Sequence, residues 1–376
     1  MSLKVTINKS LLNLATSRVQ GAITERSLSQ IGLSAKDGKL FAAATDRVLA
    51  VYSGLECQVQ SQGNAFVTAR LFSDVVRELP DGDVRLEVQG AFLVITAGKN
   101  GEFVMKVPTI EDSVWREPPS FDSGNSAELP ASKLSYMIDQ VQFCVAQESP
   151  RNYGTVGFFH RPKKDSLRLV GTDGFRLSYC DVALGMPDGF LDNGVCLSKR
   201  ALAELSRMCS EGYEKIYIAI SDDQTTMVAQ VPDYQVFVRL SAVKYPNYAG
   251  VIPENKNSAV LVSRAQLQHV AKRVLLAADK SRALQLSFSD SSLTLSSKTM
   301  GSSESKESVH LDDYHGPRFD LAVNGKFLAD VFSTVPSEKL LIQFKNVEDP
   351  IVLVPREEPN DCRSKHVLVP IRESAE

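Results

Sequence analysis

The stretch 323–335 carries a pattern of apolar and polar positions that recurs along the chain. Four apolar residues fall at the spacing i, i+3, i+4, i+7, which places them on one face of an α-helix: Leu328, Val331, Phe332 and Val335. Asn324 stands just before them, and its side-chain oxygen can accept a hydrogen bond from a free N–H of the first helical turn. The pattern predicts a strand that ends near Val323 and an amphipathic helix that follows it.

The same order of residue types occurs twice more, at 67–75 and 197–205. In each copy an apolar residue precedes a predicted capping residue, and a basic residue stands two positions after the cap. A large apolar residue, a small one, an acidic one and an aliphatic one then follow. The three caps, separated by 130 and 126 residues, are Thr68, Ser198 and Asn324.

A second helical pattern is also present three times, at 7–19, 129–141 and 262–274, and the copies align without a gap. The copies are 122 and 133 residues apart, which is too long for a solenoid unit and close to the size of a small domain. We therefore predict three copies of one domain, at residues 1–125, 126–254 and 255–376. The aligned apolar positions are Leu12, Leu134 and Leu267, and Val19, Val141 and Val274.

The rest of each repeat consists of short runs with alternating apolar residues, which are typical of β-strands. In the first repeat such runs fall at 39–54, 84–88 and 92–97, and a turn sequence, Pro80-Asp81-Gly82-Asp83, follows the second helix. Two helices and many short antiparallel strands in each repeat predict an α+β fold.

Composition places the chain among soluble proteins of a reducing compartment. Of its 376 residues, 43% are hydrophobic and 23% charged, which is ordinary for globular domains. The six cysteines are scattered and form no C-x-x-C pair, so we expect single thiols. The N-terminal stretch has no signal-peptide core and no apolar run reaches the length of a membrane span, which favours the cytoplasm.

Charge is distributed unevenly between the helical segments and the rest of the chain. The net charge of −3 alone argues against a nucleic-acid partner. The six helical segments nevertheless carry a net charge of +7, so the remainder carries −10. One interpretation is ordinary solvated helix faces, and the other is a shared basic surface within an acidic body. The bases are Lys9, Arg18, Arg70, Arg77, Lys133, Lys199, Arg200, Arg207, Arg264, Lys272, Arg273 and Lys326, and the acids are Asp74, Glu78, Asp139, Glu204 and Asp330.

The sequence contains none of the common catalytic motifs that we sought. There is no G-x-x-x-x-G-K-[ST] loop, no H-E-x-x-H and no G-x-S-x-G. His310 and His315 flank Asp312 and Asp313, but a polar loop explains this cluster better than a metal site. Asp173 has a counterpart in the Thr45-Asp46-Arg47 sequence of the first repeat, so a structural turn explains it better than catalysis. We expect no catalytic residues, no metal and no cofactor.

Several motifs together resemble the bacterial sliding clamp family, the beta subunits of DNA polymerase III. The motifs are Gly171-Thr172-Asp173-Gly174-Phe175-Arg176-Leu177, Ala44-Thr45-Asp46-Arg47, Tyr245-Pro246-Asn247-Tyr248 with Val251-Ile252-Pro253, and the ending Val367-Leu368-Val369-Pro370-Ile371-Arg372. The resemblance covers the whole chain, including its length and its threefold repetition.

This resemblance implies a head-to-tail homodimer that forms a ring of six domains, with helices lining the hole. A basic helical surface would hold the phosphates of encircled duplex DNA without reading bases, so that the ring could slide. The implied function is to tether the replicative polymerase and other replication or repair proteins to DNA, with no catalysis. Because the chain has no nucleotide site, a separate ATP-driven clamp loader would open the ring.

The resemblance also implies a pocket for short partner peptides between the second and third domains. Phe175 stands where relatives commonly have His, and Gly250 where they often have a base. The chain also continues past Arg372 into Glu373–Glu376, and these departures affect the polarity of the pocket. By matching motif the pocket residues are Thr172, Gly174, Arg176, Leu177, Pro246, Val251, Val369, Pro370, Ile371 and Arg372.

Two further sets of residues follow from the resemblance and the charge pattern. Those expected to face DNA are Arg26, Arg151, Tyr153, Arg207, Lys272 and Arg273, and those expected at the dimer seam are Phe103, Leu275 and Leu276. The alternatives are solvated loops for the first set and ordinary core for the second. At the level of the whole protein, the alternative is a three-repeat protein–protein scaffold that does not encircle DNA. A hydrolase with a novel site is a more distant third.

Overall fold

The computed structural model describes residues 2–24, 29–119, 125–147, 149, 151–253, 258–289, 291–311, 314 and 318–371. The chain divides into two compact units, and neither is a single predicted repeat. Unit 1 contains Met1–Ala131 and Arg207–Leu240, and unit 2 contains Ser132–Ser206 and Ser241–Glu376. The middle of the chain is therefore shared between the units, because its strands complete a sheet in each.

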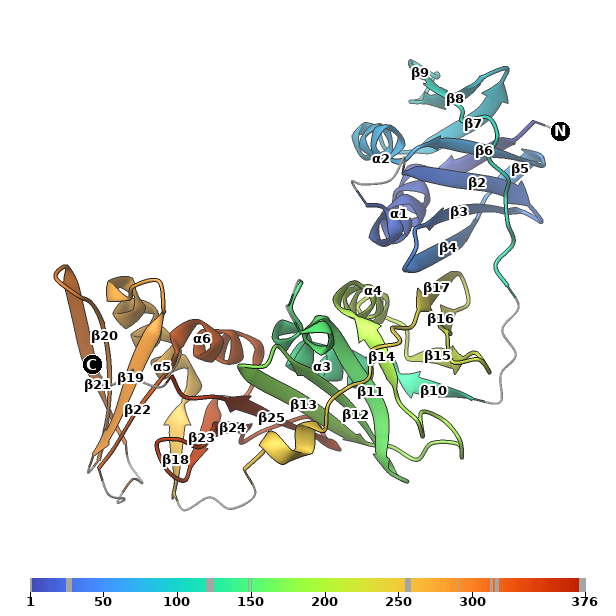
Figure 1. Ribbon diagram of the computed structural model, residues 1–376. Coiled ribbons are helices and arrows are strands. Elements are labelled where there is room, and N and C mark those ends of the chain that lie inside the picture. The colour runs from blue at the N-terminus through green and yellow to red at the C-terminus, as the bar shows by residue number, and fades with distance from the viewer. Residues whose placement is uncertain are drawn as a thin grey trace. The chain divides into compact units, whose positions relative to one another are not determined.

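Unit 1 contains a five-stranded and an eight-stranded sheet, both antiparallel at every pairing (Figure 1). The first has the order β5 (Gln58–Ser61), β1 (Lys4–Asn8), β7 (Asp83–Gln89), β8 (Phe92–Ala97), β9 (Phe103–Pro108). The second has the order β10 (Ser126–Pro130), β15 (Lys215–Ile220), β16 (Thr226–Val231), β17 (Tyr234–Arg239), β4 (Leu49–Glu56), β3 (Lys39–Thr45), β2 (Gln30–Lys36), β6 (Gly63–Thr68).

Unit 2 repeats this arrangement with an eight-stranded and a four-stranded sheet (Figure 1). The larger has the order β14 (Val195–Ser198), β11 (Val156–Lys163), β12 (Ser166–Thr172), β13 (Arg176–Ala183), β25 (Cys362–Leu368), β24 (Ile351–Pro355), β23 (Lys339–Phe344), β18 (Ser258–Ser263). The smaller has the order β21 (Ser303–His310), β20 (Ser292–Thr299), β19 (Ala283–Ser289), β22 (Phe319–Asn324).

The six predicted helices are present at the two repeated patterns. The first pattern forms α1 (Lys9–Val19), α3 (Ala131–Val141) and α5 (Arg264–Val274), and the second forms α2 (Ala69–Glu78), α4 (Lys199–Cys209) and α6 (Gly325–Thr334). In unit 1, α1 packs against α2, β3 and β4, and in unit 2, α5 packs against α6. The aligned leucines and valines are all buried, so the repetition records the positions that form the core.

The predicted caps agree with the structure at two of the three positions. The Asn324 side chain accepts hydrogen bonds from the N–H groups of Lys326 and Phe327, and Ser198 Oγ accepts one from Ala201. The prediction for Thr68 was wrong, because its side chain makes no capping bond. Its backbone is extended, as a cap requires, but the side chain does not reach the first turn.

One buried charge cluster joins segments of unit 1 that are far apart in the sequence. Arg18 is 2% exposed, and its guanidinium forms ion pairs with Glu211 (2.6 Å) and Asp233 (3.1 Å). It also donates to Ser53 Oγ and lies over the ring of Tyr234. Both interpretations of the helical charges, solvated faces and a shared basic surface, would place Arg18 at the surface, and its burial excludes both for this residue. Its charge is needed inside the unit, where it holds α1 to the segment 207–240.

Candidate partner pocket and nucleic-acid surface

A pocket of about 200 Å³ lies in unit 2 where β13, β25 and the short 3-10 helix Tyr248–Val251 meet. Seven of the ten residues predicted for the partner pocket line it: Thr172, Gly174, Arg176, Leu177, Pro246, Val251 and Val369. The structure therefore brings together, from three separate sequence segments, most of the residues that the motifs singled out.

A tight turn between β12 and β13 forms one wall. The Asp173 carboxylate accepts hydrogen bonds from the backbone N–H groups of Phe175 (3.0 Å) and Arg176 (3.1 Å). Thr172 Oγ1 donates to the Arg176 carbonyl and accepts from the Gly174 N–H. Gly174 has φ +91°, a left-handed conformation that suits glycine. The structural interpretation of Asp173 is thus confirmed, since its carboxylate holds the turn.

Arg176 contributes to the pocket through its position rather than through a free charge. Its guanidinium pairs with Asp173 (2.9 Å) and Asp330 (2.5 Å) and donates to the Phe143 carbonyl (2.7 Å). Burial works against its charged form, but Cys144 and the two aspartates outweigh this effect and raise its pKa. Because Asp173 and Asp330 already neutralise its guanidinium, Arg176 offers little free charge to a bound peptide.

The floor of the pocket is apolar and its rim is open. Leu177 and Val367 face each other across β13 and β25 and are almost fully buried. Val251 and Val369 are 54% and 45% exposed, which is unusual for valine in a folded chain. Exposed apolar side chains above a packed floor provide a surface that another chain can cover.

Tyr248 forms part of a second wall, and His160 holds its hydroxyl from outside the lining. Tyr248 lines the pocket, and its hydroxyl lies 2.9 Å from His160 Nε2. Burial, helped by the nearby Arg168 charge, lowers the pKa of His160 to about 4. His160 is therefore neutral at physiological pH.

Four lining residues were not predicted, and two others were predicted for the DNA-facing surface. Asn247, Tyr248, Pro350 and Val367 were not predicted, although Asn247, Tyr248 and Val367 lie inside the quoted motifs. Pro350 has no sequence signal, because only the strand pairing brings it here. Arg151 and Tyr153 were expected to face DNA, yet both line this pocket. Arg151 lies over the ring of Phe175 and donates to the Gly174 carbonyl.

The remaining predicted pocket residues lie at the end of the described chain. Pro370 and Ile371 are absent from the pocket lining, and the Ile371 N–H donates to the Ala322 carbonyl (2.7 Å). Ile371 thus attaches this end of the chain to β22. Arg372 and the acidic tail Glu373–Glu376 lie outside the described residues.

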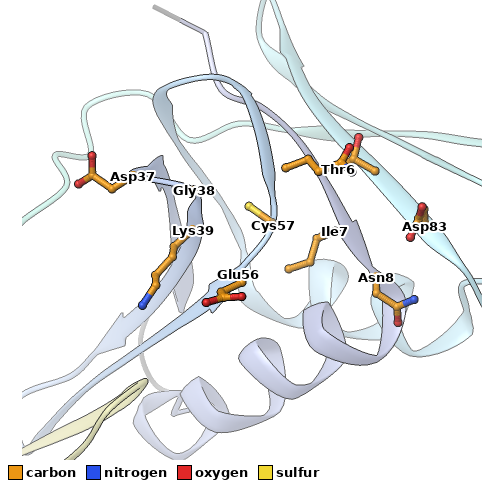
Figure 2. A pocket seen from close by; sticks show the side chains of 10 residues that line it. Thr6, Ile7, Asn8, Asp37, Gly38, Lys39, Glu56, Cys57 and Asp83 are labelled. Carbon is orange, nitrogen blue, oxygen red and sulfur yellow. The ribbon is translucent and has the colours of Figure 1, made fainter.

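A second hollow, of about 500 Å³, lies in unit 1 and is polar (Figure 2). Asp37 lies in the β2–β3 turn and Lys39 begins β3. Glu56 ends β4, Cys57 follows it, and Asp83 begins β7. Burial raises the pKa of the Cys57 thiol to about 11, so the thiol stays protonated and is a poor nucleophile. Within the described ranges, no group of three or more metal-ligating side chains is found.

A buried Cys-Ser-His chain in unit 2 also lacks catalytic character. Cys144 Sγ lies 3.0 Å from Ser178 Oγ, which lies 2.9 Å from His366 Nδ1. Burial raises the pKa of Cys144 to about 12 and lowers that of His366 to about 3. All three groups are therefore neutral and shielded from any substrate, and they form part of the core. The pair His310 and His315 cannot be compared in this way, because His315, Asp312 and Asp313 lie outside the described residues.

Comparison with known proteins covers nearly the whole chain. Sequence models of the N-terminal, central and C-terminal domains of the DNA polymerase III beta subunit match residues 3–113, 128–247 and 249–372. The chain belongs to the DNA polymerase III beta subunit family.

Individual relatives support the assignment. The beta sliding clamp of Caulobacter vibrioides is 26% identical over 98% of this chain and 100% of its own length. That of Escherichia coli is 23% identical over the same shares. Among solved structures, the C. crescentus beta sliding clamp is 25% identical, covers 99% of this chain and all of its own, and superposes with a TM-score of 0.88. A Bartonella birtlesii sliding clamp crystallised with griselimycin has a TM-score of 0.90 and 24% identity over 99% of this chain and 100% of its own.

As a member of this family, the protein is a sliding clamp. It encircles DNA, tethers the polymerase and confers processivity, and it is not an enzyme. The fold class is the predicted one, with three clamp domains built from helices and antiparallel sheets. The scaffold that does not encircle DNA is not favoured.

The side chains predicted to face DNA differ in their exposure and in the protein groups that they already bind. Lys272 and Arg273 are both exposed on α5, although Arg273 pairs with Glu307 of β21. Arg207 donates to the carbonyls of Ser17 and Arg18 at the end of α1. We therefore assign Arg207 a structural role in place of the predicted phosphate contact. Arg26 lies outside the described residues.

The predicted seam residues lie near sheet edges. Phe103 begins β9, the edge strand of the five-stranded sheet, and is half-buried. Leu275 is half-buried against Gly325 and the core of unit 2. Leu276 is 85% exposed, a large apolar area for a monomer surface.

No helix in the described part of the chain is both long and apolar enough to cross a membrane.

Proposed function

We propose that the pocket in unit 2 holds short extended peptides of the DNA polymerase and of other replication and repair proteins. The observation that carries this proposal is the pocket itself, whose exposed valines, Val251 and Val369, surround a packed floor at Leu177. The floor selects apolar side chains, and the turn 172–176 presents backbone groups to the peptide. Because Arg176 is already neutralised, we expect apolar anchoring to contribute more to affinity than ion pairing.

We further propose that two chains join head to tail into a ring, which an ATP-driven clamp loader opens. The edge strands β9 and β21 suit a seam between copies, since an edge strand has free backbone groups to pair. Leu276, Leu275 and Phe103 would give this seam an apolar centre. Each chain would contribute three domains, at residues 1–125, 126–254 and 255–376, and would work in the cytoplasm on nucleoid DNA.

Within the ring, Lys272, Arg273 and Arg26 would face the duplex and hold its phosphates. Arg151 and Tyr153 line the pocket, so we propose that they contact the bound peptide. Arg372 and the tail Glu373–Glu376 follow the pocket in sequence. Deleting residues 373–376 distinguishes a competing tail, which would give tighter peptide binding after deletion, from a solvated one, which would give no change.

The test of the pocket is calorimetry with a C-terminal peptide of the polymerase. Leu177→Ala with Val369→Ala removes apolar contacts from the floor and the rim and should weaken binding at least thirtyfold, since truncation of a hot spot costs about 2 kcal/mol or more. Val347→Ala with Val114→Ala removes two exposed valines outside the pocket and serves as the control. Parent affinity in the pocket variant would show that the pocket is placed wrongly.

A further inference from the structure

The pair of strands at the partner pocket, β13 and β25, has an equivalent pair in unit 1, β4 and β17, with the same pairing register. In unit 2, Leu177 of β13 pairs with Val367 of β25, and in unit 1 Ala50 of β4 pairs with Phe237 of β17. The Asp46 carboxylate accepts hydrogen bonds from the backbone N–H groups of Val48 (2.7 Å) and Leu49 (2.8 Å). The Asp173 carboxylate accepts the equivalent bonds from the two N–H groups at the same positions of its own turn. The same backbone structure is therefore built twice.

The closing hydrogen bonds are also equivalent. The Arg239 N–H donates to the Val48 carbonyl (2.8 Å), and the Val369 N–H donates to the Phe175 carbonyl (3.1 Å). The residue Arg239 thus occupies the position of Val369. Counting along the two turns from Asp46 and Asp173, Arg47 occupies the position of Gly174.

A hollow of about 400 Å³ lies at this place in unit 1. We call it the arginine hollow, and its main lining residues are Thr45, Arg47, Ala50, Thr226, Phe237 and Arg239. Ser53 and Tyr234 contact Arg18 of α1, and side chains alternate along a strand. Ala50, Phe237 and Arg239 therefore project from the face of the sheet opposite to α1.

The two hollows differ in charge. Arg47 and Arg239 are both exposed, and no ion pair involves either of them within the part of the chain that the structure describes. In the partner pocket the corresponding positions are the uncharged Gly174 and Val369. The carboxylate of Asp46, at the same rim, is bound by the two backbone amides of its own turn.

The floor of the arginine hollow remains apolar. Phe237 is 7% exposed and packs edge-on against Tyr52 at 5.7 Å, and Tyr52 packs in the same way against Trp115. Ala50 replaces the larger Leu177, which leaves space beside the Phe237 ring. An apolar side chain can enter here while carboxylates reach the two guanidinium groups, which bind them with charge-assisted hydrogen bonds.

We propose that the arginine hollow is a second docking site on each chain, for a short acidic protein segment. Carboxylates of the segment pair with Arg47 and Arg239, and an aliphatic side chain packs on Ala50 and Phe237. The position of the hollow favours protein over nucleic acid, because it faces away from α1, whereas the proposed ring holds DNA on its helices. The apolar floor also favours protein, because it can bind an apolar side chain and gives a phosphate group no favourable contact.

The experiment uses the full chain with the partner pocket blocked by Val251→Glu and Val369→Glu, two exposed positions. The probe is a fluorescein-labelled octapeptide of alternating Glu and Leu, followed by fluorescence polarisation at low salt. Adding Arg47→Glu and Arg239→Glu should weaken binding at least tenfold, and the corresponding Gln-Leu peptide should bind the blocked parent chain at least tenfold more weakly. The control pair, Arg85→Glu on β7 and Lys99→Glu in the turn between β8 and β9, should change affinity less than twofold.

Two results would overturn the proposal. Equal losses in the hollow and control variants would show that the general charge of unit 1 attracts the peptide. A single-stranded oligonucleotide that displaces the peptide, and that itself loses affinity in the hollow variant, would make the site a nucleic-acid contact. Neutral variants, Arg47→Gln with Arg239→Gln, check that charge loss suffices without reversal. Failure here leaves the proposed function intact, because that function depends on the partner pocket and the ring.

Discussion

At the scale of single residues, burial decides the state of the groups that looked reactive in the sequence. His366 is fully buried. Within the described residues, its ring makes one hydrogen bond, between Nδ1 and Ser178 Oγ. Its pKa is lowered to about 3 because the charged imidazolium would lose its hydration. The same burial that disqualifies it as a catalyst makes it a source of acid sensitivity.

We predict that His366 makes the protein less stable as the pH falls below about 6.5. The unfolded histidine binds a proton in this range and the folded one does not, so the unfolded state is favoured by about 1.4 kcal/mol per pH unit down to the folded pKa. His366→Asn should flatten this slope in urea unfolding between pH 6.5 and 4.5. The exposed His269→Asn is the control and should leave the slope unchanged. A slope that His366→Asn does not alter would mean that other groups cause the acid sensitivity.

At the scale of elements, the helices were predictable from the sequence and their charged partners were not. The 3.6-residue pattern fixed all six helices because the repeated leucines and valines face the core. The partners of Arg18 lie more than 190 residues away, and Arg176 pairs with Asp330 across 154 residues. Only the fold brings such groups together, so the sequence suggested a free charge where the structure has an ion pair.

The Arg18 cluster provides a test at this scale. Arg18→Leu leaves Glu211 and Asp233 partly buried without their cation, and it should lower the free energy of unfolding by about 3 kcal/mol. The exposed pair Arg77–Asp74 is the matched control, and Arg77→Leu should cost less than about 1 kcal/mol. Chemical denaturation measures both. Equal costs would mean that the buried cluster does not hold α1 to the segment 207–240.

The pocket shows the same division between what the sequence reveals and what it does not. The motifs located the turn 172–176, the segment 246–251 and the strand end at Val369, because these residues lie within the motifs themselves. Pro350 reaches the pocket through strand pairing, and Arg151 lines it because of the course of a loop. Neither could be predicted from a motif. The arginine hollow could be anticipated from the repeated Thr-Asp pair, but its match to the pocket required the pairing of β4 with β17.

At the scale of the whole molecule, the seam and the ring can be tested separately. Leu276→Asp places a carboxylate where the proposed seam needs an apolar group, and it should give a folded monomer, because an unpaired buried charge is unfavourable. Sedimentation velocity would measure the mass, and circular dichroism the fold. Leu71→Asp, at an exposed leucine of α2, is the control and should remain dimeric. A dimer with Leu276→Asp would place the seam elsewhere.

The charge of α5 gives a second whole-molecule prediction. Lys272→Glu with Arg273→Glu should shorten the time on DNA and reduce its dependence on salt, since fewer phosphates are neutralised. Single-molecule dwell times measure the effect. Arg85→Glu with Lys99→Glu should leave the dwell time unchanged, and an equal effect of both pairs would argue against a specific phosphate-binding surface.

Encirclement of DNA is the central claim, and topology tests it most directly. The protein is loaded onto nicked circular DNA with the proposed ATP-driven clamp loader, free protein is removed, and the circle is then cut once with a restriction enzyme. We predict that the protein stays on the intact circle and leaves the linear DNA by sliding off its ends, while blocking both ends with bound protein restores retention. Equal retention on circular and linear DNA with free ends would contradict the ring.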